Sequence, residues 1–137
     1  MKKTAAKRGR PALYVTYCSG RKKEDPEPMP AVRRYVSARI RAVHRKSRED
    51  AAPFAILSGE FGLLGPYQRI PYYNHLLRAD EVESLLPLVV GYLGRKGVRA
   101  VRFFHDPLRK DPRLAPYIDA IKRACRLAGA RLILTEL

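Results

Sequence analysis

The sequence predicts an α/β protein: a three-layer α/β/α sandwich of the Rossmann-like kind, around a mainly parallel sheet of about four strands. Short apolar runs, typical of buried strands, alternate three times with segments of helical period, and a last apolar run closes the chain. Strands that are separated by helices pair in parallel, and the helices then cover the sheet.

The first strand is expected over residues 12–18, where β-branched and aromatic residues dominate. A proline-rich loop follows it. Residues 31–48 then carry apolar side chains at helical spacing, with arginines on the other faces. The apolar run 53–58 predicts a second strand. Residues 59–78 are interpreted as a long loop because glycine and proline recur in them.

The second predicted helix starts near Asp80, because Glu83 follows it at the spacing of a capping box. Its apolar stripe continues to Gly97, but Pro87 interrupts the stripe. The helix therefore either kinks at Pro87 or begins its continuous part near Leu86.

The rest of the chain repeats the alternation. Residues 98–104 predict a third strand, and residues 112–128 predict an amphipathic helix that ends at Gly129. Residues 131–135 predict the last strand. We expect one domain over residues 12–137.

Ligands of parallel sheets bind beyond the carboxyl ends of the strands, near a switch in strand order. This rule selects residues 18–23, 58–73 and 105–109 as candidate site segments before any motif is considered.

Charge is the strongest feature of the composition. The 137 residues include 28 Lys and Arg against 13 Asp and Glu, a formal net charge of +15. Residues 1–48 hold 15 of the basic residues and three acidic ones. This excess favours a polyanionic partner, either nucleic acid or a nucleotide. The alternative is a basic surface that only keeps the protein soluble.

Several classes of protein are not expected. Hydrophobic residues make up 46% of the chain, too many for a disordered polyelectrolyte. No apolar run approaches the ~18–20 residues of a membrane span, so we expect no membrane partner. Cys18 and Cys125 alone make no disulfide framework, which favours the cytoplasm. The histidines show no zinc-like spacing with cysteine, so neither a metal nor a cofactor is expected.

Small and cationic residues directly follow the first strand. Gly20 lets main-chain N–H groups approach an anion closely, and the neighbouring cations supply charge. We therefore predict that phosphate is bound by Ser19, Lys22 and Lys23. The P-loop spacing is absent, and a solvated basic turn is the alternative.

The glycine-rich segment after the second strand can present polar groups to a ligand. Ser58 and Glu60 are the candidate catalytic residues there, and the rest of the segment is expected to be structural. His105 follows the third strand, next to Asp106, and is a third candidate because a neighbouring His and Asp can transfer protons. An ordinary turn beginning at Asp106 is the alternative.

Tyr73 and Asn74 are candidates for recognition of a base. A tyrosine ring can stack on a nucleobase, and an asparagine amide can read a base edge by donating and accepting together. Tyrosines at the margin of a core are also common packing residues, which is the alternative here.

Residues 1–11 are expected to form a flexible basic arm. Within it, Lys7–Pro11 matches the core of an AT-hook, in which Arg8 and Arg10 would flank Gly9 in a narrow minor groove. A generic basic arm that contacts phosphates is the alternative.

Four segments within about residues 13–77 read, in chain order, C-S-G-R-K-K, Y-V-S, I-L-S-G-E-F-G-L-L-G-P and I-P-Y-Y-N-H-L-L. Together they resemble a bacterial and phage domain family of unknown function, and more distantly the YaaA-type peroxide-stress proteins. The resemblance implies action on nucleic acid or nucleotides. The polar positions that it shares are Ser19, Lys22, Ser37, Ser58, Tyr73 and Asn74. The family often has Asp where Asn74 stands, which weakens a catalytic role at that position.

Two main functions remain open from the sequence, beside a third, a sensor of small-molecule nucleotides or a partner of a stress protein. The first is an α/β domain that binds nucleic acid or nucleotides, with enzymatic action on a nucleobase or glycosidic bond as an extension. The second is a non-enzymatic DNA-binding protein that holds phosphates with its arm and with the arginine-rich helix over 31–48.

Overall fold

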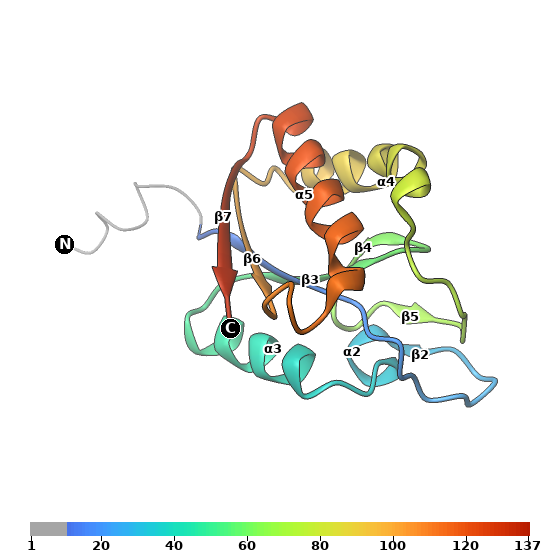
Figure 1. Ribbon diagram of the computed structural model, residues 1–137. Helices are drawn as coiled ribbons and strands as arrows, with labels where there is room; N and C mark the ends of the chain where they lie inside the picture. The colour runs from blue at the N-terminus through green and yellow to red at the C-terminus, as the bar shows by residue number, and fades with distance from the viewer. Residues whose placement is uncertain (1–10) are drawn as a thin grey trace.

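The computed structural model describes residues 11–137 (Figure 1). The arm predicted around Arg8, Gly9 and Arg10 lies outside the described residues. The four strands expected from the sequence are present and parallel, in the order β3-β1-β6-β7. Their bounds are β1 (Leu13–Tyr17), β3 (Phe54–Ser58), β6 (Ala100–His105) and β7 (Arg131–Glu136).

A fifth strand corrects the prediction that residues 59–78 are all loop. The strand β4 (Gly62–Leu64) pairs antiparallel with the end of β3, so the main sheet has five strands. Gly62 has a φ of 78°, a conformation that glycine adopts without strain where the chain turns back. Three residues are too few to show the alternation by which a strand is predicted.

A separate two-stranded sheet lies beside the main one. It pairs β2 (Met29–Pro30) with β5 (Arg69–Ile70) in antiparallel fashion. It joins the proline-rich loop after β1 to the glycine-rich segment after β4, and so fixes both near the same end of the main sheet (Figure 1).

The predicted helix over 31–48 is two helices, α2 (Ala31–Arg34) and α3 (Ala38–Glu49). Between them Tyr35 is extended and forms a β-bridge with Lys22. Ser37 then caps α3, because its Oγ accepts a hydrogen bond from the N–H of Ile40 at 3.1 Å.

Arg34 also departs from the expectation that the arginines of this segment face outward. It is fully buried, and its guanidinium donates to four main-chain carbonyls. The acceptors are the carbonyl oxygens of Lys23, Asp25, Glu27 and Ile70. Arg34 therefore holds the loop after β1 against β5 and is not available to a phosphate.

The remaining helices follow the sequence closely. They are α4 (Val82–Arg95), after the 3-10 turn η1 (Ala79–Glu81), and α5 (Ala115–Ala128), after the 3-10 turn η2 (Pro112–Leu114). Pro87 lies inside α4, so the helix begins before Leu86, at Val82. The capping carboxylate is that of Glu81, which accepts from the N–H of Arg78 at 2.9 Å, and not that of Glu83.

Helices lie on both faces of the sheet (Figure 1). On one face, the hydroxyl of Tyr14 donates to Asp50 at the end of α3, at 2.6 Å. Tyr17 points to the other face, where its ring centroid is 5.9 Å from that of Tyr117 on α5. α4 packs beside α5 on that second face. Within residues 11–137, no helix combines the length and the apolar character needed to cross a bilayer.

Candidate functional site

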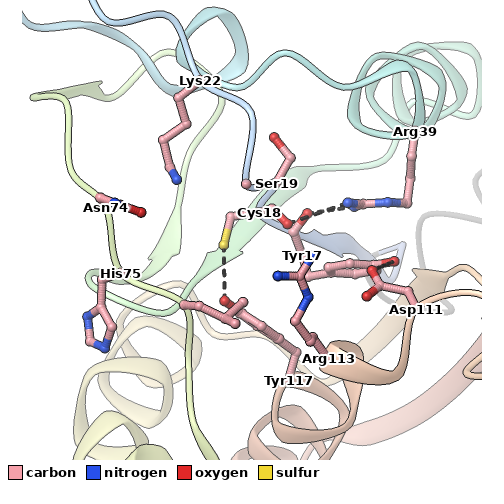
Figure 2. Close-up of a pocket in the computed structure, with 12 residues that line it drawn as sticks. Tyr17, Cys18, Ser19, Lys22, Arg39, Asn74, His75, Asp111, Arg113 and Tyr117 are labelled. Atoms are coloured by element: carbon pink, nitrogen blue, oxygen red, sulfur yellow. Dashed lines mark hydrogen bonds between the residues drawn. The ribbon is translucent and has the colours of Figure 1, made fainter.

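A pocket of about 270 Å³ opens at the carboxyl end of β1 (Figure 2). From β1 the chain continues to β3 on one side, and from the adjacent β6 it continues to β7 on the other. The pocket therefore lies at a switch in strand order, where the general rule for such sheets places a ligand. Its lining residues are Tyr17, Cys18, Ser19, Gly20, Lys22, Arg39, Asn74, His75, Leu76, Asp111, Arg113 and Tyr117.

Lys22 supplies one free cation. Its side chain points into the space between Asn74 and Cys18 (Figure 2). The ammonium lies 4.6 Å from the centroid of the Tyr73 ring, which holds it by a cation–π contact. Partial burial lowers the pKa of Lys22 from its ordinary value.

Arg113 supplies a second free cation from η2, on the other side of the pocket (Figure 2). Among residues 11–137, neither Lys22 nor Arg113 has a carboxylate within ion-pair distance. Two charges without an internal partner, facing one pocket, favour an anionic ligand.

Arg39 is a third cation, but its guanidinium is already bound. It donates to the hydroxyl of Thr16 at 2.8 Å and to the carbonyl of Tyr17 at 2.6 Å. Its guanidinium carbon lies 3.5 Å from the centroid of the Tyr17 ring. Arg39 therefore fixes the end of β1 and adds positive charge, with little donor capacity left for a ligand.

The floor of the pocket joins β1 to α5. The thiol of Cys18 donates to the hydroxyl of Tyr117 at 3.5 Å, and this hydroxyl also accepts from the N–H of Leu77 at 3.1 Å. Burial raises the pKa of Tyr117, so the group remains a neutral phenol. Asp111 is the carboxylate in the lining, and it accepts from the hydroxyl of Tyr17 at 3.3 Å.

A chain of hydroxyl groups lies behind Lys22. The hydroxyl of Tyr73 is 2.5 Å from that of Tyr35 and 2.9 Å from the Oγ of Ser58. The Ser58 oxygen is fully buried and accepts from the N–H groups of Glu60 and Phe61, at 3.0 and 3.1 Å. Ser58 therefore closes the turn after β3, and Tyr73 connects this turn to Lys22.

His75 forms the rim of the pocket together with its neighbours Asn74 and Leu76. Its Nδ1 lies 2.5 Å from a carboxylate oxygen of Glu60, and its Nε2 lies 2.9 Å from one of Glu81. The hydrogen bonds to Glu81 and then to Glu60 raise the pKa of His75 above its ordinary value. The ring is thus held between two carboxylates from different elements.

The structure brings together part of the predicted site. Ser19, Lys22 and Asn74 line the pocket, whereas Lys23 is exposed outside it. Tyr73 lies one layer behind, with its ring against Lys22 and Phe61 rather than open for stacking.

None of the three candidate catalytic residues lines the pocket. Ser58 lies behind Tyr73, and Glu60 is exposed against His75. His105 is buried at the end of β6, where its ring stacks on Phe103 and its Nδ1 bonds to the carbonyl of Asp106 at 2.8 Å.

Sequence reasoning assigned no ligand-binding role to several other lining residues. Among them are Tyr17, Arg39, Asp111, Arg113 and Tyr117. A signal for three of them existed, because the segment after the third strand was followed only to residue 109, and the helix beyond it starts at the same edge of the sheet.

Comparisons with protein-family models, with curated proteins and with solved structures find no match to this chain. Within the part of the chain that the structure describes, no three His, Cys, Asp or Glu side chains are grouped so that they could hold a metal ion.

Proposed function

We propose that the pocket binds one nucleotide unit, either free or part of a nucleic acid. The observation that carries this proposal is the pair Lys22 and Arg113, two cations without a carboxylate partner in the described residues, facing one pocket at the switch in strand order. A pocket of about 270 Å³ is near the lower end of the volumes of small-molecule sites, ~300–1,000 Å³.

The roles follow from the positions of the groups. The phosphate would sit between Lys22 and Arg113, where the main chain at Ser19 and Gly20 can approach it. Asn74 is exposed on the rim and has an amide free to bond to the edge of a base. Tyr73 would serve by positioning Lys22.

Chemistry on the base or the glycosidic bond is an extension of this proposal. The groups placed to take part in it are those that line the pocket, Asp111 and the thiol of Cys18. A carboxylate can act as a general base and a thiol as a nucleophile.

Two finer statements belong to the same proposal. We propose that the molecule is a three-layer, Rossmann-like sandwich, which the helices on both faces of the sheet support (Figure 1). We also propose membership of the family that the sequence resembles. Its support is that residues from the separate shared segments, Lys22, Ser58 and Tyr73, form one connected cluster.

The test is calorimetric titration with the four common ribonucleoside 5′-monophosphates. Lys22→Ala should weaken binding by about tenfold or more, because a charge-assisted hydrogen bond contributes ~1.5–3 kcal/mol. Lys23→Ala is the matched control and should change affinity less than about twofold, because Lys23 lies outside the pocket. Equal losses in the two variants would mean that only general positive charge matters.

A chemical probe gives an independent reading. Both cysteines are buried, but Cys18 is 7% exposed and lines the pocket, whereas Cys125 in α5 is 1% exposed and lies outside it. A bound nucleotide should slow alkylation of Cys18 by iodoacetamide and leave Cys125 as unreactive as before. Unchanged labelling of Cys18 at saturating nucleotide would place the nucleotide elsewhere.

A second function has its own observation. Arg41, Arg45 and Arg48 are exposed on α3 at the spacing of one helix face. They span about 10 Å of helix, and one strand of B-DNA carries a phosphate per ~3.4 Å of axis. This row suits the backbone of a polynucleotide, as a non-enzymatic DNA-binding protein would need.

Salt dependence separates the two functions. Changing Arg41, Arg45 and Arg48 together to Gln should lower the slope of log affinity against log salt for duplex DNA by about 2–3, since each phosphate contact contributes ~0.9. Binding of mononucleotides should not change. An unaltered slope would remove α3 from the polynucleotide surface.

A further inference from the structure

We infer that His75 is a proton-operated clamp on the rim of the nucleotide pocket, and that loss of its proton loosens the rim and weakens nucleotide binding. The effect on binding rests on the proposed function, whereas the clamp itself is a property of the free protein. The clamp is defined as the hydrogen-bonded group Glu60–His75–Glu81.

The geometry requires a charged ring. Both imidazole nitrogens face carboxylate oxygens, at 2.5 Å for Glu60 and 2.9 Å for Glu81. Carboxylates only accept, and a neutral imidazole has one N–H. Both hydrogen bonds therefore exist together only in the imidazolium form. The bond from His75 also lowers the pKa of Glu81, which keeps that carboxylate ionised.

The two carboxylates come from elements that are separate in the chain. Glu60 belongs to the turn after β3, and Glu81 belongs to η1 at the start of α4. A protonated His75 thus ties the rim segment to the sheet and to a helix at once. After deprotonation it can donate to only one of them.

The rim segment has few other attachments. Within the described residues, no main-chain group of residues 72–77 bonds to another main-chain group. The N–H of Leu77 instead donates to the Tyr117 hydroxyl, and the Tyr73 hydroxyl bonds to those of Ser58 and Tyr35. Losing one His75 bond therefore removes a substantial part of what fixes Asn74 and Leu76 at the pocket.

The change in charge at the rim also weakens nucleotide binding when His75 loses its proton. Deprotonation of His75 leaves two carboxylates with no cation between them, next to a pocket proposed to hold phosphate. Added negative charge at the rim disfavours an anion. The other charged or titratable groups that face this region are Lys22, Cys18, Asp111, Arg113 and Tyr117 around the pocket, and Arg78 and Asp80 beside Glu81.

The first experiment measures the affinity of each variant for the four ribonucleoside 5′-monophosphates across pH 6–9. Between pH 6 and pH 9, the nucleotide affinity of the wild-type protein should fall about three- to tenfold more than that of His75→Gln, whose side chain cannot titrate. This ratio cancels ionisation of the nucleotide phosphate, which occurs near ~6. Glu60→Gln should move the midpoint to lower pH, because it removes one bond to the imidazolium. Asp80→Asn, a neighbouring carboxylate paired with Arg78, should leave the midpoint unchanged.

A second experiment needs no ligand. NMR follows protonation of the His75 ring, and hydrogen exchange in the same samples follows the Leu77 amide, which donates to the Tyr117 hydroxyl. We expect the protection factor of this amide, in which the base catalysis of exchange itself is divided out, to fall above the His75 midpoint, and we expect that midpoint to move down in Glu60→Gln.

The outcomes separate the two proposals. An unmoved midpoint, or exchange indifferent to the His75 titration, overturns the clamp whether or not nucleotides bind. If no nucleotide binds at any pH, the proposed function and the effect of the clamp on binding are both wrong. The experiment on the free protein then still tests whether the clamp exists.

Discussion

At the scale of single residues, buried polar side chains of this protein are held by hydrogen bonds within the fold. Ser58 accepts from two main-chain N–H groups and bonds to Tyr73, and Arg34 donates to four main-chain carbonyls through its two terminal nitrogens. A buried polar group is tolerated when it is hydrogen-bonded, and removing its partner leaves the cost of desolvation. A residue whose type suggests catalysis or phosphate binding can therefore instead stabilise the fold through its buried hydrogen bonds.

Ser58→Ala tests this structural role. The change leaves the N–H groups of Glu60 and Phe61 without their acceptor, so the free energy of unfolding should fall by about 1–3 kcal/mol. Ser19→Ala is the control, since the Ser19 hydroxyl is partly exposed and donates to the carbonyl of Arg21, two residues along the chain. It should change stability by less than about 0.5 kcal/mol. Urea titration measures both, and a similar loss in each would contradict the assignment.

At the scale of elements, turns decide where strands and helices begin. Gly62 lets β4 turn back along β3, and there a Cβ atom would meet the Cβ of Leu88 at 2.9 Å. Gly129 ends α5 with a φ of 72° but has no atom within 4 Å of an added Cβ. Both positions have positive φ, and only the first is also crowded.

This pair gives a matched prediction. Gly129→Ala should cost about 1–2 kcal/mol, the strain of a left-handed alanine. Gly62→Ala should cost more, by a further ~1–3 kcal/mol, because overpacking adds to the strain. Thermal and urea unfolding of the two variants measure the difference. Equal losses of unfolding free energy in the two variants would show that α4 can move away at Leu88 without a loss of stability.

At the scale of the whole molecule, protonation links stability to pH. The pKa of His75 is raised by Glu81 and Glu60, so its contribution is complete below about 6.5 and is lost as pH rises through the raised value. Burial lowers the pKa of His44, so stability falls as pH drops below about 6.5 and His44 is forced to protonate. The two histidines act on opposite sides of neutrality.

The free energy of unfolding should therefore be highest near pH ~6–7. His75→Gln should flatten the decline above about pH 6.5 and leave the acid side unchanged. Urea titrations at half-unit pH intervals give the profile. If His75→Gln keeps the wild-type alkaline decline, the ring does not hold its raised pKa in the folded protein.

Strand ends in the sequence indicated the edge of the sheet at which polar residues gather, whereas residue type did not indicate which of them face the pocket. Ser19 and Lys22 line the pocket because they follow the carboxyl end of β1, and Asn74 reaches it from the segment after β5. His105 lies at the same edge, but its side chain packs under the sheet end against Phe103. A residue's position in a strand follows from local sequence, whereas the direction that is open to solvent depends on what packs against it.

The sequence by itself determined the α/β class, the four parallel strands, the three long helices and the edge at which the pocket lies. These features depend on hydrophobic period and turn residues, which are local along the chain. Only the tertiary structure decided the break at Tyr35, the strand β4, the burial of Arg34 and the clamp at His75. Each of these requires partners that are distant in sequence, such as Lys22 for Tyr35 and Glu60 for His75, and no local pattern encodes such a meeting.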